Sequence, residues 1–177
     1  SITFGVKERK DCLCWIHYAR MRFGDDVKII LSGLSMGAAT VLMATDLELP
    51  ENVIGVIADC PYSSPKAIIQ KVCCDMHLPA KLMYPFVRLG ARIFAGFDLE
   101  ESSALSAVAK AGIPILLIHG EDDRFVPCDM SRDIHKSCGS RIVFETAPGA
   151  GHGLSYMVAP QRYEEVTTEF VKSILEG

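Results

Sequence analysis

Four short apolar runs, separated by stretches with helical periodicity, restrict the fold of this chain more than any other feature. They span residues 27–33, 53–59, 113–120 and 141–147. The first of them, VKIILSG, is apolar nearly throughout, which is typical of a parallel strand that is covered on both faces. Strands that alternate with helices imply a parallel sheet with right-handed crossovers. We therefore predict an α/β fold, with a parallel sheet flanked by helices.

The stretches around these runs carry recognisable helix signals. Apolar residues recur at three- and four-residue spacing before Gly24 and predict a helix through about residue 22. Pro127 can open a later helix, which Gly139 can close. The last helix is predicted to be amphipathic, with an apolar face made of Tyr163, Val166, Phe170 and Ile174.

The segment between the second and third runs, residues 61–111, is too long for a single crossover. Its predicted elements are a helix near 65–74, an inserted segment around 79–97 that begins near Pro85, and a helix from Ser102 or Ser103 to Lys110. A chain of 177 residues, of which 49% are hydrophobic, is long enough to bury a sizeable core. We therefore predict one domain spanning residues 1–177, with residues 76–100 as a small helical lid.

Charge and hydropathy argue against two classes of partner. The formal net charge of -4 gives no broad positive field, which disfavours nucleic-acid binding. The opening residues SITFGVKERK contain no long apolar stretch, and Arg88 and Arg92 interrupt the most apolar later segment. We therefore expect a soluble protein with neither a signal peptide nor a membrane span.

Seven cysteines are scattered along the chain, an odd number with no CxxC pair. They stand at positions 12, 14, 60, 73, 74, 128 and 138, with no histidine at zinc-finger spacing. We expect most of them to be buried thiols in a reducing cytoplasm. A redox role for the adjacent Cys73 and Cys74 is the alternative.

The motif GLSMG stands where the first apolar run passes into an alanine-rich helical stretch. A strand ending at Ser32, a sharp turn at Ser35 and a helix from Met36 would raise the serine hydroxyl above the carboxyl edge of the sheet. Open α/β folds bind their ligands at that edge. Gly33 and Gly37 are expected to let the helix approach the neighbouring backbone closely. A tight turn without chemistry is the alternative.

A serine hydroxyl needs a base to remove its proton, and the base needs an acid to orient it. Asp123, in the loop HGEDDRFVP after the third run, is the candidate acid, and its neighbour Asp122 is the rival candidate. The alternative for both is an acidic loop that only forms the entry to a helix. His152 lies between glycines after the fourth run and is the candidate base. His119 is more simply explained as a residue that shapes the acid loop by hydrogen bonding. The other histidines are His17 and His135, expected at the surface or in grooves, and His77, in the lid.

The segments GLSMG, HGEDDRFVP and GAGHG, in this order and each at the end of a predicted strand, resemble the α/β-hydrolase fold. The resemblance is particularly to its serine aminopeptidase and prolyl-oligopeptidase-like esterase branches, and it runs from Lys28 to the last residue. It implies that Ser35 is the nucleophile, that Asp123 orients the imidazole and that His152 is the general base. The backbone N–H of Met36 would bind the oxyanion. The implied reaction is acyl transfer to water through an acyl-enzyme, without a metal or organic cofactor.

The chain departs from this family before the nucleophile strand. Members usually have several strands there, and a loop after one of them donates a second oxyanion N–H. This chain opens instead with SITFGVKERKD, at the entry to a helix, so we expect a truncated α/β-hydrolase fold. An apolar edge strand without a neighbour recruits a partner, and we therefore expect a homo-oligomer that associates through the edge near residues 27–33.

The predicted lid supplies candidates for the substrate pocket. Met76, Tyr84, Phe86 and Phe94 can line an apolar acyl pocket, although ordinary core packing explains them equally well. The motifs have no basic cluster nearby that would hold a phosphate or carboxylate, which favours a small uncharged carboxylic ester as the substrate. Peptide or amide hydrolysis is the chemical alternative. A domain that keeps the triad but serves as a binding or assembly module is the alternative of a different class.

Overall fold

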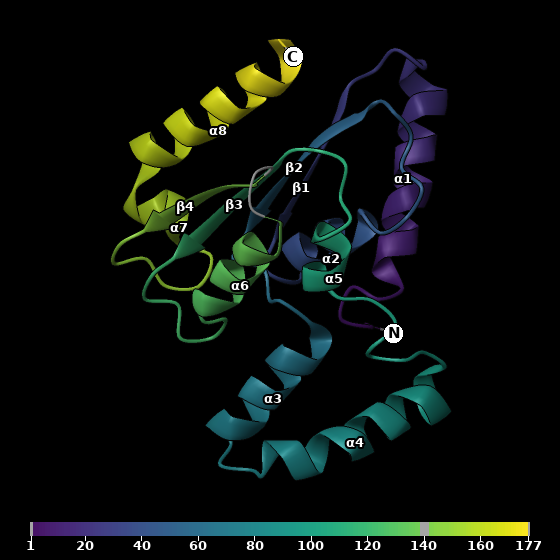
Figure 1. Cartoon of the computed structure of the whole chain (residues 1–177), viewed down its shortest axis with the longest axis vertical. Coiled ribbons are helices and arrows are strands. Elements are labelled where there is room, and N and C mark those ends of the chain that lie inside the picture. The colour runs from purple at the N-terminus through teal and green to yellow at the C-terminus, as the bar shows by residue number, and fades with distance from the viewer. Residues whose placement is uncertain (1, 139–141, 177) are drawn as a thin grey trace.

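A four-stranded parallel sheet forms the centre of the molecule (Figure 1). The structure, a computed structural model, describes residues 2–138 and 142–176. The strands are β1 (Ile29–Leu34), β2 (Val53–Asp59), β3 (Ile115–Gly120) and β4 (Ile142–Ala147). They pair in the order β1-β2-β3-β4 and every pairing is parallel, which confirms the predicted fold class. The carboxyl ends of all four strands therefore lie at the same edge of the sheet.

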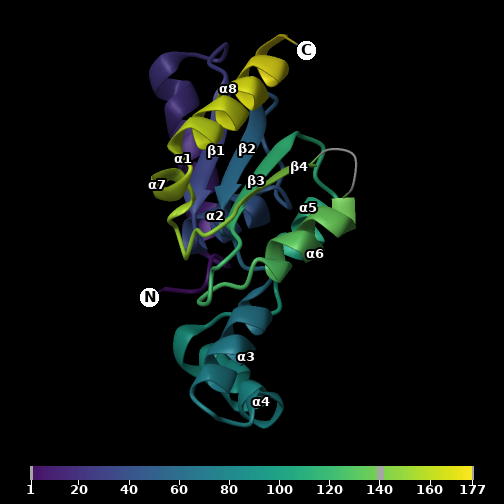
Figure 2. The ribbon, with the colours of Figure 1, turned by 90° about the vertical axis from the view of Figure 1, so that its left-hand side faces the viewer.

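Helices cover both faces of the sheet (Figures 1 and 2). One face carries α1 (Glu8–Phe23), α2 (Met36–Ala44), α5 (Ala104–Val108) and α6 (Asp129–Cys138), and the other carries α8 (Pro160–Glu176), which follows the short α7 (Ser155–Val158). Leu117 of β3 packs into the core beneath the first group, whereas its neighbour Leu116 packs against Val166 and Phe170 of α8. Successive strand residues point to opposite faces, so burial on both faces explains why the strands are apolar.

Most helix ends agree with the sequence signals. α1 is followed by Gly24, whose φ of 99° ends the helix, and Ser103 caps α5 by accepting a backbone hydrogen bond. α6 begins two residues after Pro127, and its predicted end at Gly139 lies outside the described residues. Within residues 2–138 and 142–176, no helix combines the length and the apolar character needed to cross a bilayer.

The long segment between β2 and β3 projects beyond the carboxyl edge of the sheet (Figures 1 and 2). It contains α3 (Pro65–Asp75), α4 (Ala80–Gly90) and a π-helix, η1 (Ala91–Ala95), which together we call the arm. The predicted start of the inserted segment near Pro85 is wrong, because Pro85 lies inside α4. Proline there removes one backbone donor without ending the helix. Cys73, Tyr84 and Phe97 form a buried cluster that joins the arm to Val6, which precedes α1.

The cysteines occupy several environments. Cys60, Cys73 and Cys128 are buried, Cys14 and Cys74 are exposed, and Cys12 is partly buried; these six are free thiols. The expectation that most cysteines are buried therefore holds for only half of these six. The adjacent Cys73 and Cys74 face different surroundings, the core of the arm and the solvent, and neither is in a disulfide.

Candidate active site

Ser35 occupies a strained turn between β1 and α2. Its backbone has φ 53° and ψ -116°, a conformation that residues with a Cβ rarely adopt. The Ser35 N–H donates to the carbonyl oxygen of Asp59 at 2.8 Å, and the Ala39 N–H donates to the carbonyl oxygen of Ser35 at 3.0 Å. β1 extends to Leu34, beyond its predicted end at Ser32, so strand, turn and helix follow without a gap. The turn therefore places Ser35 at the carboxyl edge of the sheet.

Gly33 and Gly37 have unequal roles in this turn. A Cβ on Gly33 would lie 2.4 Å from the carbonyl carbon of Gly37 and 2.6 Å from the backbone nitrogen of Ala38. Because these are backbone atoms, they cannot rotate away, and Gly33 is required for the close approach of β1 and α2. A Cβ on Gly37 would meet nothing within 4 Å outside its own helix. The expected steric need is thus confirmed for Gly33 and wrong for Gly37.

Asp123 lies in the loop after β3 and is buried, with 5% of its surface exposed. Its Oδ1 accepts backbone hydrogen bonds from Phe125 at 2.9 Å and from Val126 at 2.8 Å. These bonds close a tight turn and leave Oδ2 directed at His152. The rival Asp122 is exposed. The loop therefore presents Asp123, and not Asp122, to the candidate base.

His119 supports this loop from the core. Its ring is fully buried, with Nε2 2.8 Å from the carbonyl oxygen of Val126 and Nδ1 2.7 Å from the hydroxyl of Ser131. Because a carbonyl oxygen only accepts, Nε2 carries the proton and Nδ1 accepts from Ser131. Burial lowers the pKa of His119, so the ring is neutral at neutral pH. His119 shapes the acid loop, as the sequence suggested.

His152 lies in the glycine-rich loop between β4 and α7. Its Nδ1 is 2.7 Å from Oδ2 of Asp123, and its Nε2 is 2.8 Å from Oγ of Ser35. Because a carboxylate only accepts, Nδ1 donates to Asp123, and Nε2 accepts a hydrogen bond from the Ser35 hydroxyl. Gly153, the next residue, has φ 67°, a left-handed conformation that favours glycine and lets the loop bend over the sheet edge.

The structure thus brings together three residues that follow three different strands. We call Ser35, Asp123 and His152 the candidate triad. In such a chain of hydrogen bonds, the imidazole can take the serine proton while the carboxylate stabilises the resulting imidazolium. Met36 is the first residue of α2, and the first backbone N–H groups of a helix have no acceptor within it, so the Met36 N–H has no acceptor within α2.

A second buried carboxylate, Asp59, stands at the end of β2 and was missed by the sequence analysis. Its Oδ1 accepts a hydrogen bond from the Ser155 hydroxyl at 3.4 Å, and it also interacts with Tyr163 of α8. Burial raises the pKa of Asp59 to about 6, although the hydrogen bonds from Tyr163 and Ser155 act in the opposite direction. The sequence signal that could have indicated Asp59 is its position at the end of the second apolar run.

Replacing Asp59 by Asn is expected to stabilise the protein at alkaline pH and to change little at acidic pH. The folded protein keeps the Asp59 proton up to about pH 6, whereas the unfolded chain releases it near pH 3.8. Between these values the unfolded state binds fewer protons, so the free energy of unfolding falls as pH rises, by up to about 3 kcal/mol. Urea denaturation of both proteins at about pH 4.5 and about pH 8 measures the difference. If Asp59→Asn were destabilised equally at both pH values, the raised pKa of Asp59 in the folded protein would be contradicted.

The four residues predicted to line the substrate pocket do not share one environment. Tyr84 is buried in the cluster of the arm, as the core-packing alternative required. Met76, Phe86 and Phe94 are exposed, with Phe94 89% exposed. Met76 directly follows α3, Phe86 lies in α4 and Phe94 lies in η1. Of the four residues, only Tyr84 belongs to a buried cluster of the described residues.

Three other apolar side chains, none of them predicted, lie beside the candidate triad. The ring of Phe125 packs edge-on against the His152 imidazole, with 5.0 Å between the ring centres. Leu34 precedes Ser35 and approaches Gly153, and Leu154 follows the same glycine. About half of the surface of each of the three is exposed. We call Leu34, Phe125 and Leu154 the apolar rim.

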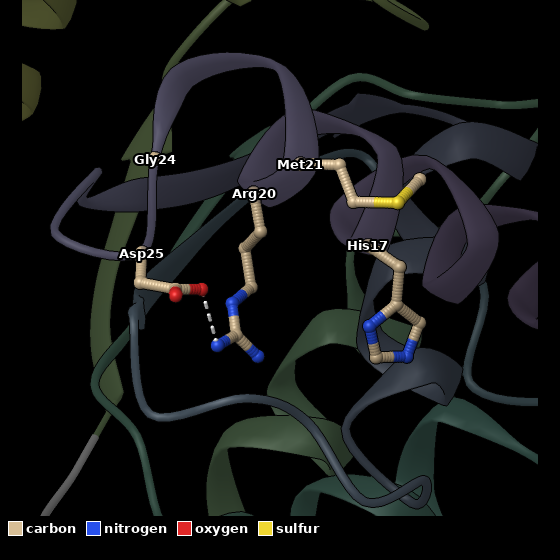
Figure 3. Close-up of a pocket in the computed structure, with 5 residues that line it drawn as sticks. All are labelled: His17, Arg20, Met21, Gly24 and Asp25. Atoms are coloured by element: carbon tan, nitrogen blue, oxygen red, sulfur yellow. Dashed lines mark hydrogen bonds and ion pairs between the residues drawn. The ribbon is translucent and has the colours of Figure 1, made fainter.

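A cavity of about 480 Å³ lies at the C-terminal end of α1 (Figure 3). It is lined by His17, Arg20, Met21, Gly24 and Asp25. Arg20 and Asp25 form an ion pair across it at 2.7 Å. None of its lining residues belongs to the candidate triad. His17 is exposed at this surface, as predicted, and has no part in the candidate active site.

Comparisons with known sequences give a family model and a bacterial relative to which this chain is similar. A family model described as serine hydrolase (FSH1) matches residues 78–153, which include Asp123 and His152 but less than half of the chain. The uncharacterized protein YqkD of Bacillus subtilis is 22% identical over 98% of this chain and 57% of its own length. The chain thus spans little more than half of this curated relative.

Solved structures show the same fold. An esterase of Pyrococcus furiosus superposes with a TM-score of 0.67 at 20% identity, over 97% of this chain and 63% of the esterase chain. The acylaminoacyl peptidase of Pyrococcus horikoshii superposes with a TM-score of 0.68 at 18% identity, over 95% of this chain and 28% of the peptidase. The chain therefore has the α/β-hydrolase fold, as its three motifs indicated.

Proposed function

We propose that this protein is a serine hydrolase that cleaves small uncharged carboxylic esters. Ser35 is the nucleophile, His152 the general base and Asp123 the acid. The observation that carries the proposal is the continuous chain from Ser35 Oγ to His152 at 2.8 Å and from His152 to Asp123 at 2.7 Å. The strained backbone of Ser35 adds support, because strain of this kind concentrates at functional sites.

The reaction proceeds through an acyl-enzyme. His152 Nε2 takes the proton of Ser35 as Oγ attacks the ester carbonyl carbon, and Asp123 stabilises the imidazolium. The Met36 N–H and the N-terminal end of α2 stabilise the negative charge on the carbonyl oxygen. His152 then protonates the departing alcohol. A water molecule, deprotonated by His152, cleaves the acyl-enzyme to a carboxylic acid and free Ser35.

The surroundings of the candidate triad favour an uncharged, apolar acyl group. The apolar rim offers about half of each side chain to solvent beside Ser35 and His152. The Lys71 ammonium lies 5.9 Å from the centre of the Phe125 ring, but it is paired with Asp75, which offsets its charge. A carboxylate substrate would therefore gain little from Lys71, whereas an apolar acyl chain gains contact with the rim.

Hydrolysis of peptides or amides is the second candidate. The superposition on an acylaminoacyl peptidase raises this candidate by analogy of fold alone, because one fold can host several chemistries. Short-chain aryl esters and aminoacyl aryl amides distinguish the two activities. Turnover of the esters alone supports the carboxylesterase proposal. Faster turnover of the amides would overturn it in favour of peptide or amide hydrolysis.

A fluorophosphonate probe tests the proposed nucleophile, because it labels only an activated serine. We expect the wild type to be labelled, and Ser35→Ala and His152→Ala to lose labelling while keeping the far-ultraviolet circular dichroism of the parent. A folded wild type that is not labelled would support the alternative of a binding or assembly module. Labelling that survives Ser35→Ala would place the nucleophile elsewhere.

Self-association through the edge of β1 stays a proposal. β1 is the first strand in the order of the described sheet, and its outer edge has no partner strand among residues 2–138 and 142–176. The adjacent α1 exposes Trp15, Met21 and Phe23. Unpaired strand edges and exposed apolar side chains both favour association.

A further inference from the structure

Cys60 is a buried thiol that the proposed mechanism leaves unused. It directly follows Asp59 at the end of β2 and has no exposed surface. Its φ of 47° is another left-handed conformation at a residue with a Cβ. Burial raises the pKa of the Cys60 thiol to about 12, whereas the backbone N–H groups of Ser35 and Gly153 act in the opposite direction, so the thiol lies close to the serine turn and the histidine loop.

This thiol forms a compact donor set with two members of the candidate triad. One ligand atom each of Cys60, Asp123 and His152 lies within 4.8 Å of the others. Cys60 and Asp123 are buried, and the His152 side chain is 27% exposed. A sulfur, an oxygen and a nitrogen donor around one point match the preference of Zn²⁺, which takes Cys, His and Asp ligands in tetrahedral sites.

We propose that Cys60, Asp123 and His152 form a binding site for Zn²⁺, and that zinc bound there inhibits the enzyme. The binding stands on the donor geometry alone, whereas the inhibition rests on the proposed hydrolase function. Three protein ligands leave the fourth position of zinc for water, so the site is open and zinc can leave again. The cation is an inhibitor here and takes no part in the catalytic reaction.

The required movements are small. Ligand atoms around zinc, at about 2.0 to 2.3 Å from the metal, lie roughly 3.2 to 3.8 Å apart. The most widely separated donors of this cluster must therefore draw together by up to about 1.6 Å, while Nδ1 of His152 and Oδ2 of Asp123 separate from 2.7 Å by about 0.5 Å or more. Because His152 is the only partly exposed member of the three, zinc enters by way of its ring, in a loop that contains two left-handed glycines.

Zinc inhibits by imposing the wrong tautomer on His152. The free imidazole carries its proton on Nδ1, which donates to Asp123, so Nε2 is free to take the proton of Ser35. Zinc binds the lone pair of Nδ1, and the imidazole proton moves to Nε2. Cys60 binds as the thiolate and releases one proton to solvent. With Nε2 protonated and Asp123 bound to the metal, His152 can no longer accept the proton of Ser35.

Cobalt binding tests the site without reference to activity. Co²⁺ bound to a thiolate gives a charge-transfer absorption in the near ultraviolet, and the full chain with exposed Cys14 and Cys74 changed to Ser is the parent. We expect this absorption in the parent, its loss in Cys60→Ser and His152→Ala, and its retention in Cys73→Ser, which removes a buried thiol of the arm. Unchanged absorption in Cys60→Ser, or its loss in Cys73→Ser, would overturn the proposal.

Zinc titration of fluorophosphonate labelling tests the inhibition. Each protein is compared with its own rate after treatment with a chelator. We expect Zn²⁺ to block labelling of the parent, excess chelator to restore it, and Cys60→Ser to need at least about tenfold more zinc. Equal sensitivity of the parent and Cys60→Ser would refute inhibition through this site. A parent that is never labelled, even with chelator, contradicts the hydrolase function instead, and the cobalt spectra still decide the binding site.

Discussion

Replacement of Asp123 by Asn is expected to lower kcat for ester hydrolysis by about four orders of magnitude. The Asn oxygen can still accept the backbone hydrogen bonds of Phe125 and Val126, which keeps the loop in place. Its amide nitrogen, however, donates to Nδ1 of His152 where the carboxylate accepted. The imidazole then carries its proton on Nε2 and cannot take the proton of Ser35. Steady-state hydrolysis of an aryl ester measures the loss.

Asp122→Asn is the matched control for this variant. It makes the same chemical change one residue away, on an exposed side chain. We expect its rate to stay within a factor of about two of the wild type, because exposed substitutions away from such networks have small effects. Equal losses in the two variants would mean that the charge of the loop matters and that the hydrogen bond from His152 to Asp123 does not.

Replacement of Gly33 by Ala is expected to damage both stability and reactivity. The added methyl group would lie 2.4 Å from the carbonyl carbon of Gly37, so β1 and α2 must move apart. Overpacking of this kind costs about 1 to 3 kcal/mol of the free energy of unfolding. Because Ser35 stands between these elements, its hydroxyl moves from His152, and a shift of about 1 Å slows the reaction about a hundredfold. Urea denaturation and the rate of fluorophosphonate labelling measure the two effects.

Gly37→Ala provides the comparison for stability. Its methyl group would enter open space, and Ala is favoured over Gly inside a helix by about 0.5 to 1 kcal/mol. We therefore expect this variant to be as stable as the wild type or slightly more stable. A loss of stability as large as that of Gly33→Ala would show that the motif needs both glycines for a reason other than the space for a Cβ.

The sheet was predictable because strand formation depends here on a local pattern. The four apolar runs become β1 to β4 with shifts of only a few residues at their ends, because burial on both faces requires apolar residues throughout. The residues of the candidate triad could be predicted from the sequence for a related reason. In a parallel sheet every strand ends at the same edge, so residues in the turns and loops that follow the strands, such as Ser35, Asp123 and His152, are brought towards one another.

The arm was predicted less well because its pattern has two explanations. Apolar residues at helical spacing mark a face that is covered, but they do not indicate what covers it. Tyr84 is covered by the arm itself, whereas Phe86, two residues later, is exposed. The position of Pro85 inside α4 was missed because proline in a sequence usually marks a helix boundary, and here the helix begins before it.

The sequence by itself determined the class of fold, the strands and the order of the three candidate catalytic segments, because each depends on neighbouring residues along the chain. The end of the second apolar run indicated that Asp59 and Cys60 reach this edge of the sheet, but only the tertiary structure decided that they lie beside the candidate triad. Their position follows from the placement of β2 between β1 and β3, a pairing between distant segments that no local pattern encodes. It likewise decided that Gly33, and not Gly37, is sterically required, because the direction of a missing Cβ depends on the packing of a helix against its strand.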